Sequence, residues 1–140
     1  MLRLTAADET DLAVISAQMQ DALLKRDDLA YDAKRRRFAL VANRFAWDAM
    51  PEKQRRRAGL HFDDVEAVQA AHLPATGRDA VLSLLAVTFE SAGKKGKDPT
   101  GSITMNFSAG IAVRLEVACI NATLADLGGS WAAHVPSHEA

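Results

Sequence analysis

The chain has 140 residues, of which 49% are hydrophobic and 25% charged, so it suits a single globular domain, 1–140, with a substantial core. No apolar run reaches the ~20 residues of a membrane-spanning helix, and the single cysteine, Cys119, excludes an internal disulfide. The N-terminal segment turns acidic too early for a signal peptide, so these features predict a cytoplasmic protein without a membrane partner.

The first predicted element is an amphipathic helix from about Ala6 to Gln20. Thr5 followed three residues later by Asp8 is typical of a capping box, in which two side chains satisfy the first backbone N–H groups of a helix. Apolar residues then recur at helical spacing, at Leu12, Ile15 and Met19. The pattern therefore predicts one long N-terminal helix with a single apolar face.

The middle of the chain alternates between apolar and polar residues with the period of a β-strand. The alternation predicts about six strands, within 24–31, 38–47, 60–68, 81–89, 103–107 and 111–119. Segment 48–59 is predicted to be a surface loop because it holds Pro51 and a polar run. No long helical pattern separates consecutive strands, so the expected sheet is a mostly antiparallel meander, curled half-way to a barrel.

The end of the chain returns to helical spacing. Ile120, Leu124 and Leu127 are followed by two glycines, which predicts a short C-terminal helix with a glycine cap. Residues 132–140 are expected to form a loose tail. The predicted fold class is therefore α+β, with the two helices covering one face of the sheet.

Charge is distributed unevenly along the chain. Residues 25–57 hold eleven Lys or Arg and five Asp or Glu, a net of +6, whereas the remainder has a net of −7. Two triplets dominate the basic part, Arg35–Arg37 at a predicted hairpin turn and Arg55–Arg57 in the following loop. If both lie at one edge of the sheet, they form a single surface for an acidic partner.

The sequence shows no catalytic or metal-binding motif. The glycine-rich segment 93–97 lacks the Ser or Thr and the helix of a phosphate-binding loop, and no two histidines have metal-ligand spacing on a predicted helix. Cys119 is in phase with Leu115 and Val117, which favours a small core residue over a nucleophile. No catalytic residue, cofactor or metal is predicted, and the sequence favours a protein that is not an enzyme while leaving that question open.

Three functions are compatible with these patterns. The preferred one is a non-catalytic interaction module whose basic edge binds an acidic protein partner. The residues proposed for that edge are Arg35, Arg36, Arg37, Arg44, Trp47, Arg55, Arg56 and Arg57.

The first alternative is a small-molecule-binding protein or enzyme with a pocket between helix and sheet, for which Arg44, His61 and Arg114 are the polar candidates. The second is a weak RNA binder, which is disfavoured because Phe38 and Phe45 fall on opposite faces of one strand and cannot form one stacking platform. A homodimer through an uncovered strand edge is compatible with all three functions.

Several stretches together resemble a known family. They are DLAVISAQMQDALLK, RRRFALVANRFAW, RRRAGLHFDDV, AVLSLLAVTFE and IAVRLEVACINATLADLGGSW. The ensemble is similar to a small alphaproteobacterial family of unknown function, catalogued as domain of unknown function 2948. The resemblance implies a bacterial cytoplasmic protein and supplies no activity, cofactor or catalytic residue.

Overall fold

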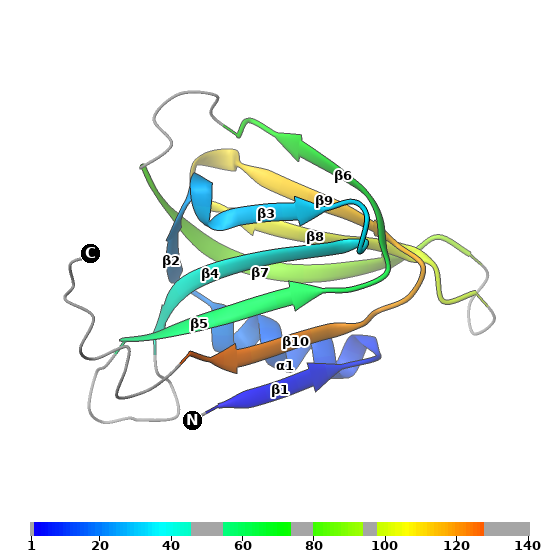
Figure 1. Cartoon of the computed structure of the whole chain (residues 1–140), viewed down its shortest axis with the longest axis horizontal. Coiled ribbons are helices and arrows are strands. Elements are labelled where there is room, and N and C mark those ends of the chain that lie inside the picture. Colours follow the sequence, from blue (N-terminus) through cyan, green and yellow to red (C-terminus); the bar gives the residue numbers. More distant parts are fainter. Residues whose placement is uncertain (1, 46–54, 74–79, 94–97, 128–140) are drawn as a thin grey trace.

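The computed structural model describes residues 2–45, 55–73, 80–93 and 98–127, and within them the chain forms one α-helix and a ten-stranded antiparallel sheet (Figure 1). The helix is α1 (Glu9–Met19), and two short 3₁₀ turns are η1 (Arg26–Asp28) and η3 (Ser108–Gly110). The strands are β1 (Arg3–Ala6), β2 (Ala22–Lys25), β3 (Leu29–Asp32), β4 (Arg37–Phe45), β5 (Arg55–Phe62), β6 (Val65–Ala71), β7 (Val81–Ser91), β8 (Gly101–Phe107), β9 (Ala112–Val117) and β10 (Ala122–Asp126).

The N-terminal helix is confirmed, but it begins later than predicted. Asp8 is the N-cap, and its Oδ1 accepts from the backbone N–H of Asp11 at 2.8 Å. The predicted cap at Thr5 is wrong, because Thr5 lies in β1 and pairs with Thr123 of β10. Asp and Thr are both favourable N-cap residues, so the local sequence allowed the helix to begin after either Thr5 or Asp8.

The sheet is antiparallel, as predicted, but its strand order is not a simple meander. The order is β1-β10-β5-β4-β2-β7-β8-β9-β6, with β3 also paired to β4. The last strand of the described residues, β10, thus lies between β1 and β5, and Figure 1 shows the sheet curling round on itself. Consecutive strands pair in β3–β4–β5 and in β7–β8–β9, whereas the remaining pairs join strands that are not neighbours along the chain.

The strand count and the predicted C-terminal helix both need correction. Ten strands replace about six, because β1, β2, β3 and β10 are each only four or five residues long. The segment predicted as a helix contains β10, in which Ala122, Leu124 and Asp126 alternate inward. Because this inward row contains an alanine and an aspartate, the sequence shows no alternation of large apolar residues there. The predicted loop 48–59 also ends earlier than expected, because β5 begins at Arg55.

Helix α1 covers a part of the sheet that the strands leave open. It packs mainly on β7 and β1, and the Ser16 Oγ accepts from the backbone N–H of Val87 at 2.9 Å. The backbone N–H of Asp21, just after the helix, donates to the Leu84 carbonyl at 2.8 Å. Because β2 pairs with only the first four residues of β7, the helix occupies the edge of β7 beyond them.

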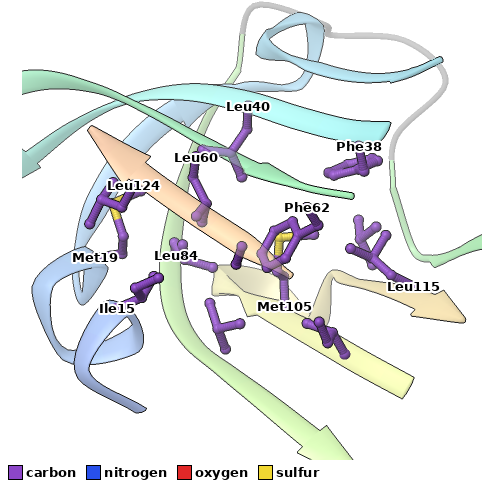
Figure 2. Close-up of a cluster of buried hydrophobic side chains, with 14 of the residues drawn as sticks. Ile15, Met19, Phe38, Leu40, Leu60, Phe62, Leu84, Met105, Leu115 and Leu124 are labelled. Atoms are coloured by element: carbon purple, nitrogen blue, oxygen red, sulfur yellow. The ribbon is translucent and has the colours of Figure 1, made fainter. Parts of the chain in front are cut away.

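One hydrophobic core fills the inside of the curled sheet. Figure 2 shows side chains from opposite parts of the fold meeting there, with Ile15 and Met19 of α1 at one side. The central members are among the most buried side chains of the protein: Leu40, Leu60, Phe62, Leu84, Met105, Leu115 and Leu124. No helix in the described part of the chain is long and apolar enough to cross a membrane.

Candidate functional site

The two arginine triplets lie at opposite ends of the same pair of strands. In the β4–β5 register, Phe45 faces Arg55 and Phe38 faces Phe62, so Arg37 and Arg55 are separated by nearly the full length of β4. Eight residue steps along a strand span about 26 Å. The sequence left open whether the two triplets form one anion-binding patch, and antiparallel pairing of β4 with β5 places the second triplet away from the first.

Acidic neighbours accompany each residue of the first triplet. Arg35 lies 3.8 Å from Asp32, and Arg36 lies 3.9 Å from Glu66. Arg37 donates to Asp63 through its Nε at 2.7 Å, and this hydrogen bond, with the charge of Asp63, raises the pKa of Arg37. The hairpin end is thus a mixed-charge surface rather than a basic one.

One residue of the second triplet, Arg55, makes contacts within the protein. Arg55 Nη1 donates to the carbonyls of Asp21 and Asn43, both at 3.1 Å, and its guanidinium lies 5.9 Å from the centre of the Phe45 ring. Arg56 lies opposite Arg44 across the β4–β5 ladder, and Arg57 is exposed. Trp47, the aromatic residue proposed for the same surface, lies outside the described residues, as does the predicted tail.

Arg44 is not a surface residue. Its side chain is 0% exposed, and its Nε and Nη2 donate to the two carboxylate oxygens of Asp126 at 2.8 and 2.9 Å. Burial on its own would raise the pKa of Asp126. The hydrogen bonds from Arg44 and from the Leu2 backbone N–H, with the charges of Arg44 and Arg56, outweigh burial and lower it. Arg44 therefore forms a buried ion pair inside the protein, and it is unavailable to a partner at the surface.

The other two pocket candidates do not join Arg44. His61 alternates with the buried Leu60 and Phe62 on β5, so it faces outward, with its Nδ1 3.3 Å from Asp63 Oδ2. Arg114 also faces outward from β9, where its Nε lies 2.8 Å from Glu116. The predicted polar constellation between helix and sheet is thus not assembled from these three residues.

Cys119 lies after the end of β9 rather than in the predicted inward row of that strand. It is half-buried, and its thiol lies 3.5 Å from an Asp64 carboxylate oxygen. Burial and this neighbour raise the pKa of the Cys119 thiol, which keeps it protonated at neutral pH and a poor nucleophile. Over the described ranges no cluster of three or more His, Cys, Asp or Glu is placed to hold a metal ion.

A groove lies where the curled sheet fails to close, between β3 and β6. In the described part of the chain β3 pairs with β4 alone and β6 with β9 alone, so each presents one unpaired edge. The two strands diverge in Figure 1. We call the space between them the seam groove; its volume is about 130 Å³, and it is lined by Arg26, Leu29, Ala30, Tyr31, Phe38, Val68, Ala70, Leu73 and Val113.

One end of the seam groove is tied shut. The Val65 backbone N–H donates to the carbonyl of Arg36 at 2.9 Å, and the Tyr31 hydroxyl donates to the carbonyl of Val65 at 2.9 Å. β6 runs away from this tie towards Leu73, and β3 begins near Arg26 at the same far end. The groove therefore has a closed end at Val65 and an open end between Arg26 and Leu73.

The sequence carried weak signals for both features. Arg44 falls in the same alternating row as Phe38, Leu40 and Ala42, and a charge in an inward row requires an opposite partner. The segment VEAVQAA holds one charge and neither lysine nor proline, which is unusual for an edge strand. Neither signal identifies the partner, because β6 and β10 are brought into place by pairing with strands far away in the sequence.

These features define a class of protein: a curled, mostly antiparallel sheet with one helix, an apolar core and a groove between two unpaired strand edges. The chain belongs to the family described as protein of unknown function (DUF2948), whose model matches residues 2–138. No curated protein and no solved structure matches the chain.

Proposed function

We propose that the protein is a non-catalytic interaction module that binds an extended segment of a partner protein in the seam groove. The observation that carries the proposal is the pair of unpaired strand edges flanking an apolar groove. An extended peptide that adds to a free edge gains main-chain hydrogen bonds, and its alternate side chains enter the adjacent pocket.

β6 is the more favourable edge for such an addition. It has seven residues against four in β3, and its exposed positions are mostly alanines. Edge strands usually avoid foreign pairing through lysine, proline or short length. β6 has none of these three protections, although its pairing with β9 shifts register between Val65 and Ala67, at the closed end of the groove.

The dimensions of the groove favour side chains of a peptide over a whole small-molecule ligand. Its volume is about 130 Å³, whereas ligand pockets usually enclose about 300–1,000 Å³. The groove also lies between two strands and not between helix and sheet, where the small-molecule alternative expected its pocket. The cytoplasmic location, to which the single cysteine is suited, remains part of the proposal.

Two neighbouring alanines of β6 provide a matched test. Ala70 lines the groove opposite the buried Val113, and Ala71 faces outward opposite Ala112. Linear peptides selected on the immobilised protein from a random library should bind the wild type and Ala71→Glu equally. They should lose about tenfold or more in affinity on Ala70→Glu, because a carboxylate would enter an apolar space.

The controls separate folding and self-association from recognition. Thermal unfolding must show that both variants fold, and light scattering must show whether a second copy of the chain occupies the edge instead. Equal binding to the wild type and Ala70→Glu would reject the groove as the site. Failure to enrich any peptide above the background found with Ala70→Glu would reject the proposed function.

A further inference from the structure

The seam groove contains one charged residue among its nine lining residues. Arg26 lies at the open end, in the 3₁₀ turn between β2 and β3, and the other lining side chains are apolar except for Tyr31. The Tyr31 hydroxyl is already bonded to the Val65 carbonyl. The electrostatic character of the groove is therefore set by a single guanidinium group.

The hydrogen-bonding capacity of Arg26 is poorly used within the described residues. Its Nε is buried and has no hydrogen-bond partner there. Its Nη1 lies 3.7 Å from Asp27 Oδ1, which is longer than a hydrogen bond, and the Asp27 side chain is 59% exposed. An ion pair of this length to a largely exposed carboxylate contributes little, so the charge of Arg26 is only weakly compensated by Asp27.

A carboxylate is the group that suits Arg26 best. It supplies a counter-charge to the guanidinium at the open end of the groove, and charge-assisted hydrogen bonds are about twice as strong as neutral ones. A neutral amide can accept a hydrogen bond from the guanidinium but leaves the positive charge uncompensated. A segment lying along β6 passes the open end and brings one of its side chains to Arg26.

We infer that the seam groove selects an extended segment carrying an acidic side chain, whose carboxylate pairs with Arg26 while the neighbouring apolar side chains fill the groove. This inference rests on the proposed function, since it names the chemistry of the segment that the groove binds. It also gives a physical basis for an acidic partner that does not depend on the separated arginine triplets.

The test is a double-mutant cycle that pairs Arg26 with the acidic residue of a peptide selected on the wild-type protein. The peptide and its amide counterpart, with Asp changed to Asn or Glu to Gln, are titrated against the wild type and Arg26→Gln. The wild type should prefer the acidic peptide by about tenfold or more, and Arg26→Gln should bind both peptides equally. Arg3→Gln, at the distant edge strand β1, is the matched control and should keep the full preference.

Three results would count against the inference, and they differ in whether they also reject the proposed function. A peptide that depends on Ala70 but shows no acidic preference would overturn the role of Arg26 and leave the proposed function intact. Absence of any groove-dependent peptide would remove both. Binding of hexanoate with an affinity lost in Arg26→Gln, without peptide binding, would assign the groove to a small carboxylic acid instead.

Discussion

Replacing Asp126 by asparagine isolates the energetic role of the buried ion pair. The substitution keeps the size of the side chain but leaves the Arg44 charge, which is 0% exposed, without a counter-charge. Breaking a buried pair by removing one partner costs about 3–5 kcal/mol. For a 140-residue domain this corresponds to a fall in Tm of roughly 10–17 °C.

Urea unfolding followed by far-UV circular dichroism measures this loss. The midpoint should fall while the m-value is unchanged, because the same surface is exposed on unfolding. The double variant Arg44→Met, Asp126→Leu should recover most of the stability, since an apolar pair of similar volume avoids burying charge. Recovery should fall short by about 1 kcal/mol because the Leu2 backbone N–H loses its acceptor. A loss below about 1 kcal/mol in Asp126→Asn would refute the reasoning.

The same carboxylate predicts a difference in acid stability. The pKa of Asp126 is lowered in the folded state, so its contribution is complete above the unfolded value of about 4 and is lost as the pH falls through the folded value. Between these two values the unfolded state binds more protons, and stability therefore rises with pH. The unfolding free energy of the wild type should thus fall more steeply below about pH 4 than that of Asp126→Asn. Parallel curves would contradict the assignment.

Two further predictions concern the sheet and its contact with α1. Gly101→Ala should cost about 2 kcal/mol or more, because a Cβ there would lie 2.4 Å from the Glu90 carbonyl oxygen; Gly59→Ala is the control, with its nearest contact at 3.5 Å and an expected cost below about 1 kcal/mol. Ser16→Ala should cost about 1–2 kcal/mol in urea unfolding because the Val87 N–H loses its acceptor. Unchanged stability in Ser16→Ala would mean that water replaces the hydroxyl.

Local pattern predicted the elements that carry large apolar residues over most of their length, even in β7, where a register shift between Leu84 and Ala86 moves the buried row to Val87. The spacing of Leu12, Ile15 and Met19 gave the helix, and the alternation over 81–89 and 111–117 gave β7 and β9. The same reasoning failed over 120–127, where the inward row contains alanine and aspartate instead of large apolar residues. A buried aspartate is indistinguishable from an exposed one until its partner is known.

The sequence by itself determined an antiparallel sheet with one N-terminal helix, because the periods of side-chain burial are local properties of the chain. The tertiary structure alone decided the order of the strands and the pairing of Arg44 with Asp126, which join residues 82 positions apart. It also decided which edges remain unpaired, and hence where the seam groove lies. Strand order depends on which distant parts of the chain pack together. The residues that make such contacts show no periodic pattern that would identify their partners.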